Sequence, residues 1–238
     1  MSRTPRAGPE ASVNLPSEIV QVQEIHKAGD RFIVLGRVNA VVYEVVILRL
    51  PSMSVEDVFW CYKPSVSPDG LNVAYLKFYP PHFTEGTEDH YMVYDLMKSP
   101  GANRPEGVAQ TDKINVGRTL FPPNSSNSEY DNVRRDQPSH TAAMKRFFWS
   151  EDSRLLVFAD RFKNALTLVR ARKDAALGTF KLSGTVDVSG KVCSEAPQSP
   201  CYFLLTAITF RGSEAHPIFS PLSGAGSTKS FSLLVQDQ

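Results

Sequence analysis

Two ten-residue segments of this 238-residue chain match each other without a gap, and this internal repeat is the feature that most constrains the fold. Ser67–Leu76 reads SPDGLNVAYL and Ser150–Ala159 reads SEDSRLLVFA, so each places Ser and Asp ahead of an apolar segment. Ser and Asp side chains hydrogen-bond the backbone of tight turns, and Gly70 can adopt a positive φ. The repeat therefore predicts two hairpins that are built in the same way.

Short segments rich in β-branched and aromatic residues dominate the rest of the chain, and turn-forming residues bound each of them. No clean apolar helical pattern continues beyond about three turns, although Ala171–Gly178 is compatible with one helical turn that ends at its glycine. Strands are expected at Asp30–Leu35, Val41–Leu48, Val58–Tyr62, Leu71–Leu76, Tyr91–Tyr94, Arg154–Ala159, Ala165–Val169, Cys201–Leu205 and Phe231–Val235. Many short strands joined by turns predict an all-β sandwich, barrel or propeller.

The repeated turn resembles the WD40-like repeat of TolB-type β-propellers, whose blades carry a Trp-Ser-Pro-Asp-Gly type of stretch before an alternating strand. Ser67, Asp69 and Gly70 match that pattern well, while Ser150 and Asp152 match it with Glu for Pro and Ser for Gly. Propeller blades recur at about 40 to 45 residues. The 83 residues between the two aspartates are close to two such steps.

The resemblance implies an all-β fold, a propeller-like array of short antiparallel sheets with about four to six blades, and a β-sandwich is the alternative. We expect a disordered N-terminal arm at residues 1–18 and a single propeller-like domain at residues 19–238. A loop-rich insertion is expected at about 97–141, with one strand near Ile114–Leu120. Pro217–Gly224 is a weaker third copy of the turn, without the Asp.

The charge balance and the apolar runs limit the partner classes. The chain carries 26 Lys and Arg against 25 Asp and Glu, so no bulk positive charge favours a nucleic-acid partner. Its most apolar run, Val38–Leu50, is too short and too polar to span a bilayer. Because no apolar segment follows Arg3 and Arg6, no secretory signal is predicted. The default expectation is a cytoplasmic protein, or an extracytoplasmic one if the natural N-terminus is longer.

Three cysteines leave the redox compartment open. Cys61 lies in an apolar run and is expected to be a buried, unreactive thiol. Cys193 and Cys201 flank a turn-rich stretch, where they would close a small loop by a disulfide in an oxidising compartment. The alternative is a pair of reduced thiols on neighbouring strands.

Motifs that carry catalysis are absent from the sequence. There is no G-x-S-x-G, P-loop, G-x-G-x-x-G, H-E-x-x-H or C-x-x-C motif. TolB-like propellers also cap prolyl-oligopeptidase-type hydrolases, but the hydrolase part is missing here. We therefore expect no catalytic residue, no metal and no cofactor. The predicted function is a non-catalytic binding or scaffolding module that presents loops to a protein or a small ligand. The alternative is a hydrolase or lyase for glycan or peptide, with converging carboxylates in a central channel.

One loop combines several residue types that bind ligands. Imidazole and carboxylate groups suit divalent cations and cationic ligands, and the loop also contains aromatic side chains. Its candidate ligand-binding residues are Tyr79, His82, Glu85, Glu88, Asp89 and His90. The alternative is an acidic loop tip that water solvates.

Overall fold

The computed structural model describes residues 15, 18–78, 90–121, 146–162, 165–193, 203–211, 214–221 and 227–234. Regular structure in these ranges is nearly all β-strand, which confirms the all-β prediction. Within them lie only a 3₁₀ turn, η2 (Pro100–Asn103), and a four-residue helix, α2 (Ser189–Val192), and no helix is long and apolar enough to cross a membrane. The expected arm at residues 1–18 falls almost entirely outside the described residues.

The first sheet contains seven antiparallel strands in chain order, and a bend in its central strand divides it into two units. The strands are β1 (Gln21–Ala28), β2 (Arg31–Arg37), β3 (Val42–Arg49), β4 (Ser54–Val66), β5 (Asn72–Lys77), β6 (Tyr91–Asp95) and β7 (Arg118–Phe121). In β4, the pairing with β5 shifts register between Tyr62 and Ser65, and Lys63 has a φ of 48°. We call β1 to β4 the first unit and β4 to β7 the second unit.

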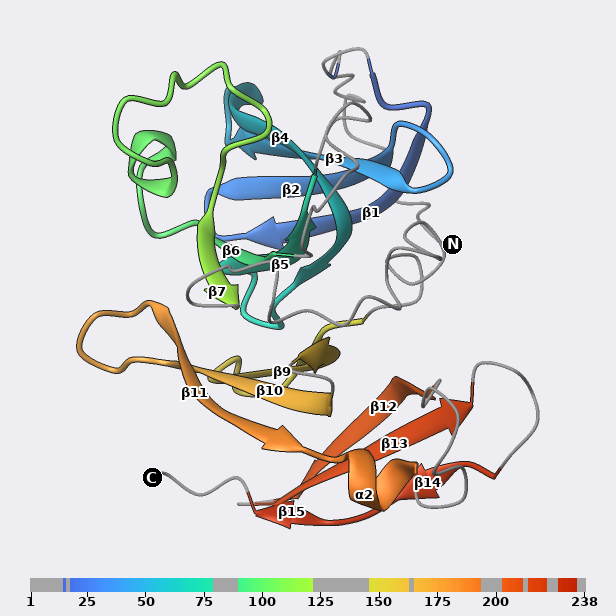
Figure 1. Cartoon of the computed structure of the whole chain (residues 1–238). Coiled ribbons are helices and arrows are strands. Elements are labelled where there is room, and N and C mark those ends of the chain that lie inside the picture. The colour runs from blue at the N-terminus through green and yellow to red at the C-terminus, as the bar shows by residue number, and fades with distance from the viewer. Residues whose placement is uncertain are drawn as a thin grey trace, which may run out of the picture.

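Two smaller sheets follow, and Figure 1 shows them below the first sheet. The third unit has the order β11-β10-β9-β8, and in the fourth unit β13 pairs with β12 on one side and with β14 and β15 on the other. The strands are β8 (Phe148–Trp149), β9 (Leu155–Phe162), β10 (Ala165–Lys173), β11 (Phe180–Asp187), β12 (Phe203–Arg211), β13 (Glu214–Pro221), β14 (Lys229–Ser230) and β15 (Leu233–Leu234).

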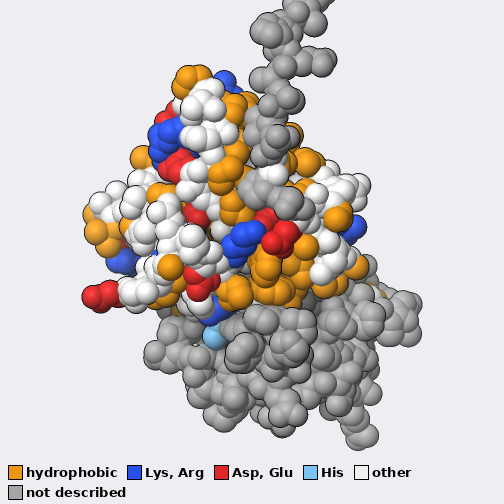
Figure 2. Space-filling model, turned by 90° about the horizontal axis from the view of Figure 1, so that it is seen from above, with side chains coloured by type: hydrophobic (Ala, Val, Ile, Leu, Met, Phe, Trp, Pro, Cys, Tyr) orange, Lys and Arg blue, Asp and Glu red, His pale blue; other side chains and the backbone are white. Residues whose placement is uncertain are grey.

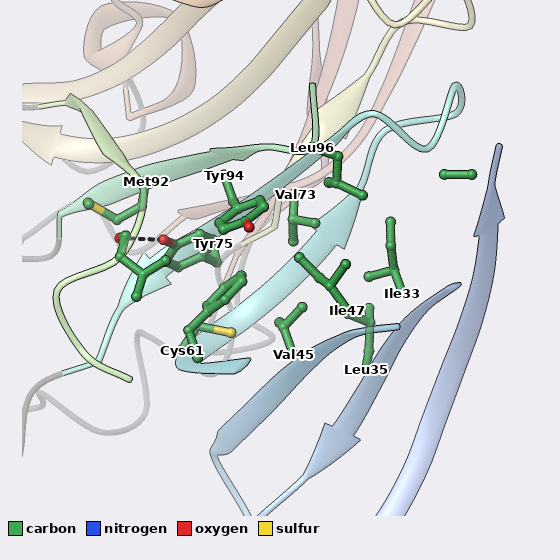
Figure 3. Close-up of a cluster of buried hydrophobic side chains, with 13 residues drawn as sticks. Ile33, Leu35, Val45, Ile47, Cys61, Val73, Tyr75, Met92, Tyr94 and Leu96 are labelled. Atoms are coloured by element: carbon green, nitrogen blue, oxygen red, sulfur yellow. Dashed lines mark hydrogen bonds between the residues drawn. The ribbon is translucent and has the colours of Figure 1, made fainter. Parts of the chain in front are cut away.

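The units pack face to face, and one apolar cluster fills each of the three interfaces. In β5, Val73 and Tyr75 point into the cluster shared with the first unit, which Figure 3 shows, whereas Ala74 and Leu76 point into the cluster shared with the third unit. Because a strand buried on both faces needs apolar side chains on both, β5 is a continuous apolar run rather than an alternating one. A third cluster, which includes Val157 of β9 and Phe219 of β13, joins the third and fourth units.

This stacking selects between the two expected architectures. A β-sandwich has two layers, whereas the described strands form four successive layers. The layers stand side by side as propeller blades do, in open sheets that do not close into a barrel.

Five strands were not predicted from the sequence, namely β1, β11 and β13 and the two-residue strands β8 and β14. Most side chains of β1 are exposed, and every side chain of β11 after Phe180 is at least partly exposed. These two strands therefore tolerate polar residues, and their sequences contain few of the β-branched and aromatic residues that indicate a strand. Neighbouring strands supply the backbone hydrogen bonds that make these segments strands.

Two sequence predictions are met only in part. Pro217–Pro221 of the third repeat copy continues β13, where Ser220 pairs with Leu204 and contacts the Thr206 hydroxyl group, and the remainder of that copy lies outside the described residues. The helical turn expected at Ala171–Gly178 is confirmed only at its end: β10 continues to Lys173, and the Gly178 backbone N–H then donates to the Asp174 carbonyl group over 2.8 Å, with a φ of 64° at Gly178. Pairing with β9 and β11 on both sides satisfies the β10 backbone as a strand.

Candidate functional site

The first repeated turn joins β4 to β5 through a closed set of hydrogen bonds. The Ser67 hydroxyl group donates to Asp69 Oδ1 over 2.5 Å and accepts from the Asn72 backbone N–H over 3.0 Å. Asp69 Oδ1 also accepts from the Leu71 backbone N–H over 3.0 Å. Gly70 has a φ of 71°, the left-handed conformation that glycine adopts without strain.

The second turn joins β8 to β9 with the same bonds. The Ser150 hydroxyl group donates to Asp152 Oδ1 over 2.6 Å and accepts from the Leu155 backbone N–H over 2.9 Å. Asp152 Oδ1 accepts from the Arg154 backbone N–H over 3.0 Å, and Ser153 has a φ of 58° where the first turn has its glycine. The two segments that match in sequence thus have matching atomic interactions.

The two turns also contact each other. The Asp69 backbone N–H donates to Ser153 Oγ over 2.8 Å, and Lys173 Nζ lies 3.4 Å from Asp69 Oδ2. Burial opposes the charge of Asp69, but the bonds from Ser67 and from the Leu71 N–H, together with Lys173, lower its pKa overall. The residues of the repeat therefore hold the second and third units together, which is a structural role.

A cleft of about 480 Å³ lies at the outer edge of the second unit. One wall comes from β5, β6 and β7, a second from the segment between β6 and β7, and a third from Thr179 and Phe180 at the start of β11. Ligand pockets typically have volumes of about 300–1,000 Å³. The cleft is therefore large enough for a small molecule or a peptide side chain.

The cleft combines an apolar surface with positively charged groups. Val93, Val116 and Phe180 contribute apolar side chains, while Lys77 and several residues of the second wall contribute polar ones. Burial lowers the pKa of Lys77, because desolvation penalises its charge, although Asp112 acts in the opposite direction.

A buried ion pair fixes the second wall to the sheet. The Arg104 guanidinium group donates to both carboxylate oxygens of Asp57, over 2.6 and 2.8 Å, and each side chain is only 1% exposed. Tyr94 donates its hydroxyl group to Asp57 Oδ2 over 2.9 Å, and burial and the nearby Asp57 raise the pKa of Tyr94. Arg104 also donates to the carbonyl groups of Pro100 and Asp112, so one side chain organises the whole segment.

The ligand loop predicted from sequence lies outside the described residues from Tyr79 to Asp89. His90 is described, immediately before β6, where its carbonyl oxygen accepts from the Lys77 backbone N–H over 2.9 Å. Among the described residues, no group of three or more His, Cys, Asp and Glu side chains could hold a metal ion. The loop hypothesis therefore remains a prediction.

Sequence reasoning missed the cleft. Its second wall belongs to the stretch that was expected to be a loop-rich insertion, and it carries Lys98, Arg104 and, at the start of β7, Arg118. A partner for Arg104 could not be identified, because Asp57 lies 47 residues earlier in a strand with no unusual pattern. The density of cations in that stretch was the only available signal.

The cysteines divide into two kinds. Cys61 is buried and free, and burial raises the pKa of its thiol, as expected for an unreactive core residue. Cys193 is disulfide-bonded, which corresponds to the first of the two alternatives above. Cys201 lies outside the described residues.

The described surface seen in Figure 2 is mixed. Cationic and anionic side chains lie among hydrophobic ones on this face, without a stripe of one sign. A basic stripe is the usual electrostatic footprint of a nucleic-acid site, and the described residues on this face do not form one.

Comparisons with known proteins place the chain beside propeller domains at low similarity. No protein-family model and no curated protein sequence matches it. It is similar to the β-propeller domain of the trilobed protease from Pyrococcus furiosus, with a TM-score of 0.45 and 12% identity over 92% of this chain and 55% of that chain. For oligopeptidase B from Leishmania major the TM-score is 0.45, with 11% identity over 90% of this chain and 31% of that chain. For TolB from Acinetobacter baumannii it is 0.21, with 11% identity over 87% and 52% of the two chains.

The chain spans about half of the protease propeller chain and under a third of the oligopeptidase. The activities of those longer proteins are not assigned to it.

Proposed function

We propose that this chain is a non-catalytic binding module of propeller type and that the cleft at the edge of the second unit is its ligand site. The observation that carries the proposal is the cleft itself, with a volume of about 480 Å³ and a wall that the buried Asp57–Arg104 pair holds in place. A preformed wall lowers the ordering cost of binding. A protein side chain or a small molecule is the expected occupant.

The repeat is proposed to be of the WD40-like, TolB type. The two Ser-Asp turns support this proposal. Each turn has the same three side-chain hydrogen bonds within it, and the two turns contact each other where the second unit packs on the third. A scaffold of stacked sheets presents the segments between strands at its rim, where binding residues commonly lie.

The alternative of a hydrolase or lyase has less support. A glycosidase needs a pair of carboxylates about 5–10 Å apart, and Asp95 is the only Asp or Glu among the described residues that line the cleft. Its side chain is buried, and Oδ1 accepts from the Met97 backbone N–H over 2.9 Å. A general acid or base must be available to its substrate, so Asp95 is poorly placed for this role.

Filling the cleft tests the binding role without any assumption about ligand charge. Ala102 is exposed and lines the cleft, so Ala102→Trp should close it. Thermal-shift and NMR screening against anionic, neutral and cationic peptides and small molecules should find binders of the wild-type protein, and Ala102→Trp should lose them. Ala109→Trp is the matched control, because Ala109 is exposed and lies outside the cleft.

Two results would refute the proposal. One is that every binder found also binds Ala102→Trp equally well, which would move the ligand site elsewhere. The other is turnover of glycoside or peptide substrates by the purified chain, which would favour the enzyme alternative.

A further inference from the structure

We infer that the cleft selects organic anions, in which a carboxylate or phosphate group is attached to an apolar body. The inference rests on the proposed function, because it names the ligand class for the same cleft. Three observations carry it: the charges that line the cleft, the engagement of those charges with other groups, and the apolar surface between them.

The lining charges are predominantly positive. Among the residues that the structure describes, Lys77, Lys98, Arg104 and Arg118 line the cleft, and Asp95 is the only carboxylate that does. Arg104 is neutralised by Asp57 and does not count toward the surplus. Asp95 is 7% exposed, and Oδ1 already accepts a backbone hydrogen bond. The surplus that a ligand can meet among the described residues therefore comes from Lys98 and Arg118.

Both of these cations are available to a ligand. Arg118 is exposed and Lys98 is partly exposed, and within the described part of the chain neither side chain forms an ion pair. Arg31, by contrast, is paired with Glu56 over 2.8 Å, so Arg118 and Lys98 differ from a cation that joins two strands.

The position of the cations favours a strong interaction. A cleft with low-dielectric walls focuses the field of its charges, and a guanidinium group binds carboxylate or phosphate through two parallel hydrogen bonds.

The rest of the cleft suits an apolar body. Ala102 and Pro105 lie exposed on its second wall and provide apolar surface, while the almost fully buried side chains of Val93, Val116 and Phe180 lie beneath the cleft. Free phosphate or acetate would leave this surface uncovered. An aromatic or aliphatic acid would cover it while its anionic group reaches the cations.

A matched pair of probes tests the inference. N-acetyl-L-phenylalanine carries a carboxylate, and N-acetyl-L-phenylalanine amide has the same body without the charge. Isothermal titration should give an acid that binds at least tenfold more tightly than the amide, and added salt should weaken only the acid. Phenyl phosphate separates the two anion sources, because its affinity relative to the acid shows which headgroup the cleft prefers.

Charge reversal provides the variant test. Lys98→Glu with Arg118→Glu should abolish the preference for the acid over the amide. Lys27→Glu with Arg211→Glu makes the same change in net charge at exposed positions outside the cleft and should keep the preference. Circular dichroism melting checks that both double variants are folded.

Each remaining outcome decides against the inference. Equal binding of acid and amide, or a preference that survives Lys98→Glu with Arg118→Glu, would show that the cleft does not select anions. If neither the acid nor phenyl phosphate binds while other compounds bind in a manner sensitive to Ala102→Trp, the anion inference fails and the proposed function stands. If no compound is sensitive to Ala102→Trp, both fail.

Discussion

At the scale of single residues, Asp57 and Arg104 form a buried ion pair, and loss of either side chain would leave an unpaired charge inside the protein. Both side chains are 1% exposed, and Arg104 holds the cleft wall through carbonyl groups as well. A buried ion pair adds little net stability, but removal of one partner leaves an uncompensated charge. The pair therefore matters most for the geometry of the wall.

Asp57→Ala should lower the free energy of unfolding by about 3–5 kcal/mol, since Arg104 would remain buried without a counter-ion. Urea unfolding followed by circular dichroism measures this loss. The double variant Asp57→Ala with Arg104→Ala should lose less than the sum of the single losses, because it leaves no unpaired charge. A loss under about 1 kcal/mol for Asp57→Ala would contradict the burial of the pair.

Gly70 tests the fit of the first repeated turn. A Cβ atom there would lie 2.8 Å from the Ala28 Cβ atom, and the φ of 71° is unfavourable for alanine. Gly70→Ala should therefore cost roughly 2–3 kcal/mol, whereas Gly178→Ala, which also has a positive φ but no atom within 4 Å, should cost about 1 kcal/mol. Equal losses in urea unfolding would show that the turn does not press against the first unit.

At the scale of elements, the same Ser-Asp turn occurs between β4 and β5 and between β8 and β9. Contact between the two turns joins the second and third units. Trp149 of β8 donates its indole N–H to the Ser65 hydroxyl group over 3.0 Å and packs edge-on against Phe180, with ring centroids 5.3 Å apart. The turn that follows Trp149 contacts the turn that follows Val66. Trp149 therefore packs between the second and third units.

The β10–β11 turn should make stability depend on acidic pH. A hydrogen bond from Lys181, then those from the Leu177 and Ala176 backbone N–H groups, lower the pKa of Asp174 to about 2, from an ordinary value of 3.8. A carboxyl group with a lowered pKa in the folded state stabilises the protein above its unfolded pKa, and that contribution is lost as the pH falls. The loss should therefore fall between about pH 4 and pH 2.

Asp174→Asn should flatten the dependence of unfolding free energy on pH in that window. Lys181→Met, which removes the largest cause of the shift, should move the remaining dependence to higher pH. Urea unfolding at a series of pH values measures both. An unchanged slope in Asp174→Asn would mean that this turn does not contribute to acid sensitivity.

The elements also show how far sequence reasoning reached. Strands with continuous apolar runs, such as β3, β5 and β9, were predicted near their observed positions. Strands such as β1 and β13 were missed, since their pairing with a neighbour, rather than their own composition, makes them strands. The cleft was missed for a similar reason: its cations come from segments that only the folded sheet brings together.

At the scale of the whole molecule, stability depends on contacts between units that have no hydrogen-bonded strand pairs in common. Tyr91 of β6 and Phe158 of β9 stack with ring centroids 4.0 Å apart, and the Tyr91 hydroxyl group donates to Asp160 Oδ2 over 2.7 Å. Both rings are fully buried in the cluster between the second and third units. This cluster couples the first sheet to the rest of the chain.

Tyr91→Ala should lower the free energy of unfolding by about 3–5 kcal/mol through the cavity that it creates. Hydrogen exchange should show faster exchange in β9 as well as in β6, because both strands lose the same packing. Phe219→Ala, in the cluster between the third and fourth units, is the comparison and should affect β12 and β13 more than β6. Loss of protection confined to β6 would mean that the units unfold independently.

The local pattern of residues was enough to determine the strand-rich class and the two Ser-Asp turns, because side-chain alternation and turn chemistry act over a few neighbouring residues. Only the tertiary structure decided which faces meet, that Asp57 finds Arg104, and that Lys77, Lys98 and Arg118 share one cleft. Those outcomes depend on where strands that are far apart in the sequence end and how they pack together. The spacing of residues along the chain does not show which of them come close in space.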